Sequence, residues 1–270
     1  MAADMAAPSA ENSPIPNPEA LADDMRAPLM ARLLAFADDE LLLAQRDGEW
    51  TGHAPILEED IALANLAQDE LGHAQLYYQL YEALSGQAPD SMVYQREAAA
   101  WRNVQLVELP NGDWAQTMLR HYLFDCYEAC LLPALATSRY TPLAEVAATI
   151  RKEERFHLQH SALWVKRLGL GTEESQRRVQ QALDLLWPYT PQLFAPLTGD
   201  AALQAAGILP DIASVQALWQ EHVQSTLQHA SLVIPQALQS SPSREQHSPH
   251  LAPVIATLQE VAQLAPVGSW

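Results

Sequence analysis

The feature that most constrains the fold is an uninterrupted amphipathic stretch from Leu57 to Ser85, which ends at Gly86. Apolar residues recur in it at intervals of three and four, the spacing of one face of an α-helix. At 1.5 Å per residue, a helix of this length is roughly 40 Å long. Helices of that length are typical of a bundle rather than of a compact α/β domain. We therefore predict an all-α protein.

Three further long segments show the same helical periodicity. They run from about residue 21 to 48, from about 113 to 138 and from about 141 to 168. Shorter helices are expected at about 91–103, 172–187, 211–228 and 251–265, with an exposed loop over the Ser-, Pro- and His-rich residues 240–250. No convincing segment of alternating apolar and polar residues is found. The pattern predicts a ferritin-like four-helix bundle with additional C-terminal helices.

The chain has 270 residues, enough to bury a core without disulfides or a structural metal. Residues 1–20 are rich in Ala, Pro, Ser and Asn, and we expect them to form a disordered tail. Residues 21–270 are expected to form a single ferritin-like helical domain.

The two cysteines, Cys126 and Cys130, lie four residues apart in an apolar run. On a helix both would point up one face, a poor geometry for a disulfide. We interpret them as small buried hydrophobic residues of a protein in a reducing compartment.

The formal net charge of −18 argues against binding to nucleic acid or to an anionic membrane, since both require a cationic surface. The N-terminal residues lack the basic segment of a signal peptide, and Asp4 and Glu11 interrupt them. No apolar run approaches the roughly 18–20 residues that span a bilayer. We expect a soluble, cytoplasmic protein.

Two of the long helices carry the motif Glu-x-x-His. It comprises Glu70 and His73 in the second helix and Glu154 and His157 in the fourth. A spacing of three residues places a carboxylate and an imidazole side by side on one helical face. Such pairs are the ligands of di-metal sites in helical bundles.

An acidic residue stands immediately before each of these glutamates, namely Asp69 and Glu153. In di-metal bundles such a carboxylate can accept the second N–H of a metal-bound histidine on a neighbouring helix, which fixes the histidine tautomer. We predict this supporting role for both residues.

The other two long helices each place one glutamate in an apolar stripe. Glu40 follows Leu33 by seven residues, and Glu128 follows Phe124 by four. All four glutamates should therefore point into the bundle, where unpaired carboxylates would repel one another. Bound cations would make the arrangement tolerable.

The sequence thus predicts a dinuclear site whose ligands are Glu40, Glu70, His73, Glu128, Glu154 and His157. Taken singly, such a glutamate is usually solvated or salt-bridged, and one Glu-x-x-His motif often arises by chance. The combination argues against coincidence. Two imidazoles and four carboxylates with open positions suit iron, or manganese as an alternative, in a site that binds dioxygen. No catalytic residue beyond these ligands is assigned.

The remaining histidines are given lesser roles. His121 is expected to be a hydrogen-bonded core residue, and His160 to lie off the ligand face. The others belong to a late helix or to a loop: His222, His229, His247 and His250.

Several segments resemble one family. They are Gln45–Pro55, with its Gly-Glu-Trp-x-Gly-His-Ala-Pro run, Glu58–Asn65, Val107–Asp113 and the terminal Trp270. They are similar to the C subunits of phenylacetyl-CoA 1,2-epoxidase, over about residues 30–270. The resemblance implies a ferritin-like protein that pairs with a homologous catalytic A subunit within a bacterial monooxygenase of several components. That complex epoxidises the ring of phenylacetyl-CoA in phenylacetate degradation.

The resemblance also implies a structural role, because the C subunits are generally regarded as having lost their metal ligands. This sequence departs from that pattern, since the six ligand residues match a competent di-iron set, although the site could also be empty.

The acidic chain offers few residues for a coenzyme A phosphate, so we expect the partner to bind most of the substrate. Self-association is also expected. The alternatives are a di-iron oxygenase active in its own right and an iron-storage protein.

Overall fold

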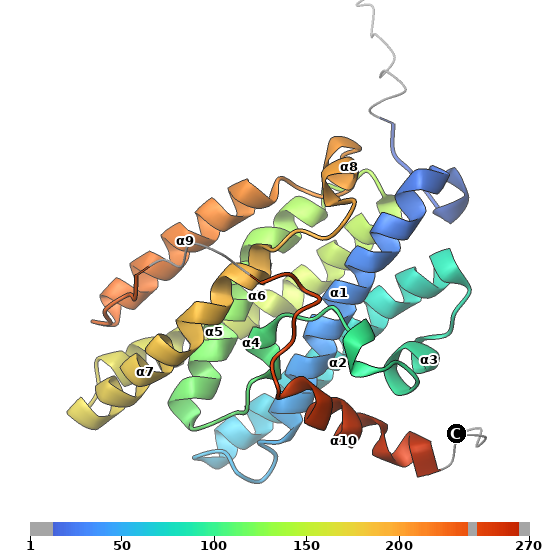
Figure 1. Cartoon of the computed structure of the whole chain (residues 1–270). Helices are drawn as coiled ribbons and strands as arrows, with labels where there is room; N and C mark the ends of the chain where they lie inside the picture. The colour runs from blue at the N-terminus through green and yellow to red at the C-terminus, as the bar shows by residue number, and fades with distance from the viewer. Residues whose placement is uncertain (1–12, 237–241, 265–270) are drawn as a thin grey trace, which may run out of the picture.

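The computed structural model describes residues 13–236 and 242–264, and within these ranges it contains helices but no β-strand (Figure 1). The α-helices are α1 (Asp23–Gly48), α2 (Leu57–Ser85), α3 (Pro89–Tyr94), α4 (Gln105–Glu108), α5 (Trp114–Leu135), α6 (Thr141–Gly169), α7 (Glu173–Leu186), α8 (Asp200–Ala205), α9 (Ile212–His229) and α10 (Leu251–Leu264). The all-α prediction is confirmed.

The four long helices α1, α2, α5 and α6 form the bundle. Helix α1 packs along α2, α5 packs along α6, and α2 also contacts α6. The later helices α7 and α9 lie against α5 and α6, whereas α10 lies beside α3 and α1 (Figure 1). This is the predicted ferritin-like bundle with additional C-terminal helices.

Local sequence signals set several helix ends where we expected them. Gly86 follows α2 in the left-handed conformation, at φ 74°, a region that glycine enters without a Cβ clash. The side chains of Asp113 and Thr172 cap α5 and α7 by accepting backbone N–H groups. Helix α6 begins at Thr141, as expected, and Tyr140 occupies its capping position without a side-chain hydrogen bond.

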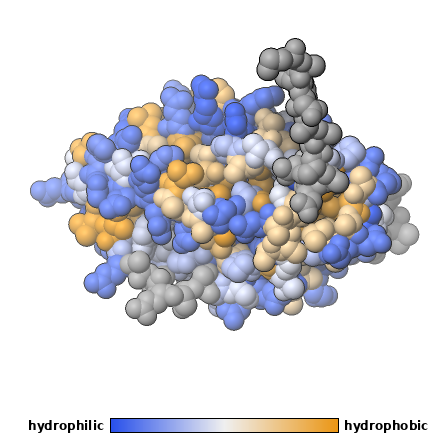
Figure 2. Space-filling model, turned by 90° about the horizontal axis from the view of Figure 1, so that it is seen from above, coloured by the Kyte–Doolittle hydropathy of each residue, from blue (hydrophilic) through white to orange (hydrophobic). Residues whose placement is uncertain are grey.

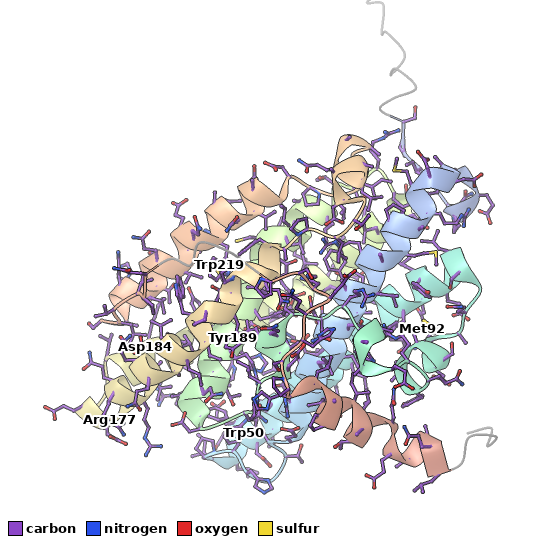
Figure 3. The ribbon with its side chains drawn as sticks, in the orientation of Figure 1. Trp50, Met92, Arg177, Asp184, Tyr189 and Trp219 are labelled. Atoms are coloured by element: carbon purple, nitrogen blue, oxygen red, sulfur yellow. The ribbon has the colours of Figure 1, made fainter. Side chains whose placement is uncertain are left out.

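The core is built from the apolar stripes of the bundle helices, with Leu33, Leu42, Tyr77, Phe124 and Leu132 among its buried residues. A smaller cluster of Leu63, Leu66 and Met118 is covered by three tryptophans. Trp114 makes edge-to-face contacts with both Trp50 and Trp164, with ring centroids 5.3 Å apart in each pair. Figure 3 shows Trp50 beside the connection between α1 and α2. These rings cover the smaller cluster.

The prediction of one continuous helix over residues 91–103 is wrong. The chain forms α3, a short 3₁₀ turn at Ala98–Ala100, and then an extended stretch that leads into α4. The backbone N–H of Arg102 donates to Asp38 at 2.9 Å, and that of Val104 donates to Asp39 at 2.7 Å. Two consecutive carboxylates of α1 therefore bind the N–H groups that a helix would use internally.

The predicted disordered tail is too long. Its residues 1–12 lie outside the described residues, but residues 13–20 are packed against the body. The Ile15 N–H donates to the Arg139 carbonyl at 2.6 Å, and the Thr141 N–H donates to the Ile15 carbonyl at 2.9 Å. The Arg139 guanidinium donates to the Ser13 carbonyl. These backbone contacts hold the segment to the start of α6.

The segment 242–250, which we name the connecting segment, is a loop with mostly exposed residues, as its composition predicted, but one of its residues is anchored in the interior. Residues 240 and 241 of the predicted loop lie outside the described residues. The Arg244 side chain is fully buried, and its Nη1 donates to Asp39 Oδ2 at 2.7 Å. Nδ1 of His247 lies 2.7 Å from a Glu108 carboxylate oxygen. The hydropathy of the sequence could not predict that Arg244 is buried, because its burial depends on the ion pair with Asp39.

None of the helices in the described ranges is both long and apolar enough to cross a lipid bilayer. On the face shown in Figure 2, hydrophilic side chains separate several smaller apolar patches.

Candidate metal centre

The structure brings the six predicted ligand residues together in the interior of the bundle. Each is at most 4% exposed. One comes from α1, two from α2, one from α5 and two from α6, and they are Glu40, Glu70, His73, Glu128, Glu154 and His157. Four helices are thus needed to assemble the set.

The imidazole of His73 faces three carboxylates. Its Nδ1 atom lies 3.3 Å from Glu154 Oε1, 3.5 Å from Glu70 Oε2 and 3.8 Å from Glu40 Oε2. These distances bring glutamates from three helices around one nitrogen.

The imidazole of His157 meets two of the same carboxylates. Its Nδ1 atom lies 2.8 Å from Glu154 Oε1 and 3.3 Å from Glu70 Oε1. The two imidazole rings are 5.9 Å apart between centroids. Glu70 and Glu154 therefore lie between the two histidines, where a carboxylate can bridge two ions.

Two compact donor groups result. One contains Glu40, Glu70 and His73, the other contains Glu70, Glu154 and His157, and the donor atoms of each lie within 4.8 Å of one another. Glu70 belongs to both groups. Glu128 belongs to neither, but its charge acts on the same carboxylates. The arrangement suits two adjacent cations that share Glu70.

Eight donor atoms of this cluster are buried without a hydrogen-bond partner. They are one oxygen each of Glu40 and Glu128, both oxygens of Glu70 and Glu154, and Nδ1 of His73 and His157. Leaving a buried polar atom unsatisfied costs about 1–3 kcal/mol. Metal ions would satisfy all of these atoms at once, so the residues present fit a di-metal group.

The protonation equilibria of the cluster reflect the crowding of its charges. Burial and the neighbouring carboxylates raise the pKa of Glu40 and Glu128 well above the usual value. Burial opposes ionisation of Glu70, but the neighbouring Glu40, His157 and His73 side chains outweigh it and hold its pKa well below the usual value. Protons therefore balance part of the negative charge, and bound cations would take their place.

The outer nitrogens of the two histidines meet the two acidic residues that precede the glutamates. His73 Nε2 lies 2.8 Å from Glu153 Oε2, and His157 Nε2 lies 3.2 Å from Asp69 Oδ2. Each carboxylate thus contacts the histidine of the opposite helix. A proton held at Nε2 leaves the Nδ1 lone pair directed at the glutamates.

Two other histidines are paired elsewhere. His121 Nε2 lies 2.6 Å from Asp47 Oδ1 in the core. Burial lowers the pKa of His121, but Asp47 and Asp125 outweigh this effect and raise it to about 10. His160 Nε2 lies 2.7 Å from Glu59, on the outer side of α2 and α6. Neither belongs to the donor groups.

Sequence reasoning missed Tyr77, a buried residue one helical turn after His73. Burial and the charges of Glu40 and Glu128 raise the pKa of Tyr77 well above its usual value, so the phenol remains protonated beside the carboxylates. Its four-residue spacing from His73 was the available signal.

Two arginines, Arg46 and Arg120, are buried and hydrogen-bonded within the protein. Arg46 donates to the Glu108 carbonyl and to Glu49, and Arg120 donates to the Leu109 carbonyl and to Asn111. Arg155 is exposed on α6.

Comparison with known proteins gives the family. The family model described as phenylacetic acid catabolic protein matches residues 3–270. The chain is 38% identical to the C subunit of 1,2-phenylacetyl-CoA epoxidase from Escherichia coli (strain K12) over 245 residues, which cover 90% of this chain and 99% of that protein. It is 26% identical to the A subunit of the same organism's enzyme over 175 residues, 64% of this chain and 56% of that protein. The chain therefore belongs to the phenylacetic acid catabolic protein family.

Proposed function

We propose that the chain is a subunit of a ring-1,2-phenylacetyl-CoA epoxidase, in which it acts as the structural partner of a catalytic A subunit. The observation that carries this proposal is the breadth of the similarity to the C subunit of the Escherichia coli enzyme, which spans 99% of that protein. The similarity to the A subunit extends over only 56% of that protein, at lower identity. The related chains would assemble in the cytoplasm with the other epoxidase components.

We further propose that this subunit retains a working di-iron ligand set. Glu40, Glu70 and His73 would hold one ion, and Glu70, Glu154 and His157 the other, with Glu128 as the remaining carboxylate. Iron bound there would supply dioxygen activation. The chain itself would bury the ligands and exclude water. Its Asp69 and Glu153 carboxylates would orient the imidazoles.

The negative charge of the chain supports the proposal that the partner subunit binds the substrate. A coenzyme A thioester carries phosphates, and this chain has a net charge of −18. Arg46 and Arg120 are buried and donate to internal carbonyl groups. The catalytic partner would therefore bind most of phenylacetyl-CoA.

A second candidate function is a di-iron oxygenase that acts without the partner. The convergence of the six predicted ligand residues and the two histidine–carboxylate contacts between α2 and α6 favour it. Iron storage has no such support, because the family is that of phenylacetate catabolism.

One experiment separates these functions. The purified chain is loaded with ferrous iron under anaerobic conditions, exposed to air and followed by iron content and visible absorption. It is then supplied with phenylacetyl-CoA, reductase and electrons, with and without the A subunit of the same organism. We expect iron binding, and epoxide formation only when the A subunit is present. Epoxide formation by the chain alone would establish the second candidate instead.

Assembly with the A subunit is tested separately by co-expression and size-exclusion chromatography. We expect one complex that contains both chains. Separate elution under all conditions would refute the structural role. Failure of the chain to bind iron would refute the ligand proposal and leave the structural role intact.

A further inference from the structure

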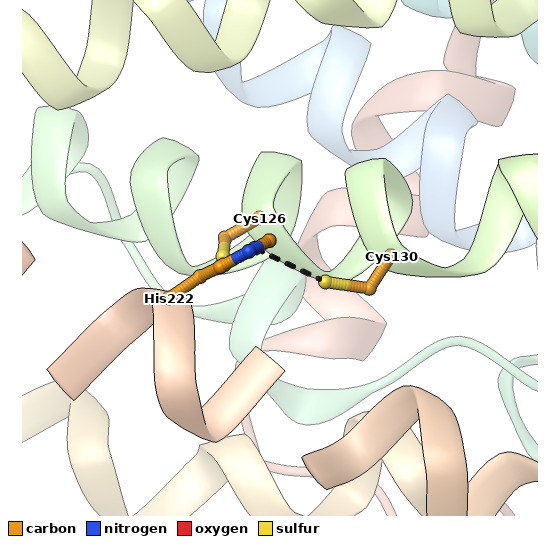
Figure 4. Close-up of side chains that lie close together, drawn as sticks. All are labelled: Cys126, Cys130 and His222. Atoms are coloured by element: carbon orange, nitrogen blue, oxygen red, sulfur yellow. Dashed lines mark hydrogen bonds between the residues drawn. The ribbon is translucent and has the colours of Figure 1, made fainter. Parts of the chain in front are cut away.

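A second group of metal-binding side chains lies outside the carboxylate centre. Cys126 and Cys130 of α5 converge with His222 of α9, as Figure 4 shows. The Sγ atom of Cys130 is 3.7 Å from Nδ1 of His222. One donor atom from each of the three residues lies within 4.8 Å of the other two.

The separation between Cys130 Sγ and His222 Nδ1 is close to that between two ligands of a tetrahedral metal ion. Zinc binds thiolate sulfur at about 2.3 Å and imidazole nitrogen at about 2.0–2.1 Å, so neighbouring sulfur and nitrogen ligands lie about 3.6 Å apart. The four-residue spacing of the cysteines places both sulfurs on one face of α5. Small side-chain rotations would complete the geometry.

The group is separate from the carboxylate centre. Glu128 lies two residues from each cysteine, and two residues of an α-helix turn about 200°. The Glu128 side chain points into the four-helix bundle, whereas the two sulfurs face α9. Occupation of one site therefore leaves the ligands of the other in place.

Two hydrogen bonds fix α9 against α5 beside the group. The Trp219 indole N–H donates to the Leu123 carbonyl at 2.9 Å, and the Tyr122 hydroxyl donates to the His222 carbonyl at 3.3 Å. Both cysteines are buried, but His222 is exposed. The three ligands are thus positioned in advance, and one side stays open for an ion to enter and for a water ligand.

We propose that Cys126, Cys130 and His222 form a binding site for one thiophilic metal ion, Zn²⁺ in the first instance. Two thiolates and an imidazole suit zinc, whereas the oxygen-rich centre suits iron or manganese. Zinc binding forms two Zn–S bonds and one Zn–N bond, and releases the two thiol protons to solvent. No electron transfer is involved.

The test uses Co²⁺ as a spectroscopic probe on the full-length, reduced chain. Thiolate ligands give cobalt a charge-transfer absorption that carboxylates and imidazoles cannot produce, so the band reports this site alone. We expect the band to appear with about one Co²⁺ per chain and to be lost on addition of Zn²⁺. Absence of the band in the wild-type chain would overturn the proposal.

Variants assign the ligands. Cys126→Ala with Cys130→Ala should abolish the band, and His222→Gln should lower Co²⁺ affinity at least about tenfold. Two matched controls should leave it unchanged: His229→Gln, on the same helix, and Glu128→Gln, in the carboxylate centre. A band that survives the double cysteine variant, or an affinity unaltered by His222→Gln, would contradict the assignment.

A measurement on the wild-type chain covers the case in which the cysteine variants do not fold. Zinc should protect both thiols from alkylation, as mapped by mass spectrometry after brief treatment of the folded chain. Equal alkylation of Cys126 and Cys130 with and without zinc would refute the site.

Discussion

His73 on α2 and Glu153 on α6 are joined by a 2.8 Å contact between Nε2 and a carboxylate oxygen. A second contact joins the same two helices, but here the histidine, His157, belongs to α6 and the carboxylate, Asp69, belongs to α2. Each histidine is therefore oriented by the helix that supplies the other histidine. The orientation of the two imidazoles and the packing of α2 against α6 therefore depend on the same two contacts.

Removal of the supporting charges should weaken metal binding without removing a ligand. We expect Asp69→Asn and Glu153→Gln each to lower iron affinity by about 10- to 100-fold, since the outer carboxylate orients the imidazole and raises its basicity. Anaerobic ferrous titration measures the effect.

The chain offers a matched control in Glu59, which pairs with His160 across the same two helices but outside the donor groups. Glu59→Gln should leave the affinity unchanged. Equal losses in all three variants would mean that packing, not ligand orientation, is responsible.

Glu70 should be the most sensitive ligand, because it belongs to both donor groups. The Glu70→Ala chain should fall from about two bound iron ions to about none. Metal content after desalting gives the answer. Glu82→Ala, an exposed position on the same helix, serves as the control. Unaltered metal content in the Glu70→Ala chain would show that the ligands lie elsewhere.

The buried ion pair between Arg244 and Asp39 should contribute to the stability of the fold. Arg244→Met leaves the Asp39 carboxylate buried with the Val104 N–H as its remaining donor, which should lower the free energy of unfolding by about 3–5 kcal/mol. Urea denaturation measures the loss. Arg177→Met, which breaks the exposed contact with Glu174, should change nothing measurable. Equal stability of the two variants would refute a structural role for the pair.

His121 should give the fold a dependence on pH. Its folded pKa is about 10, above the usual 6.5, so its contribution is fully present below about pH 6.5 and is lost as the pH rises through 10. Over this window stability should fall with pH by at most about 1.4 kcal/mol per unit. His121→Gln should reduce this slope and lower stability at neutral pH, because Asp47 loses its partner.

Unfolding free energies of the two chains at about pH 7 and 10 test this dependence. Parallel pH profiles for the wild type and His121→Gln would rule it out. His229→Gln, at an exposed position, should reproduce the wild-type slope.

The four long helices and the convergence of the six ligand residues were predictable from the sequence. Helical periodicity links residues three and four apart, so the faces of Glu70 with His73 and of Glu154 with His157 follow from local spacing. The apolar stripes around Glu40 fixed its inward direction in the same way. That these residues bind iron stays a prediction.

Features that depend on distant partners were not predictable. The extended stretch before α4 exists because Asp38 and Asp39 bind its N–H groups. The proximity of His222 to Cys130 requires α9 to pack on α5, and the two residues are 92 positions apart. No local pattern encodes such pairings, since each needs the tertiary arrangement of two elements.

The ion pair between the connecting segment and α1 also bears on how the chain matures during synthesis. Asp39 emerges from the ribosome early, whereas its cationic partner, Arg244, is 205 residues further on. Until that residue arrives, the Asp39 carboxylate lacks the guanidinium group that neutralises it in the folded chain. The last tenth of the chain therefore supplies the ion pair that neutralises Asp39. A nascent bundle that lacks this part of the chain should be more accessible to proteases and chaperones than the finished protein.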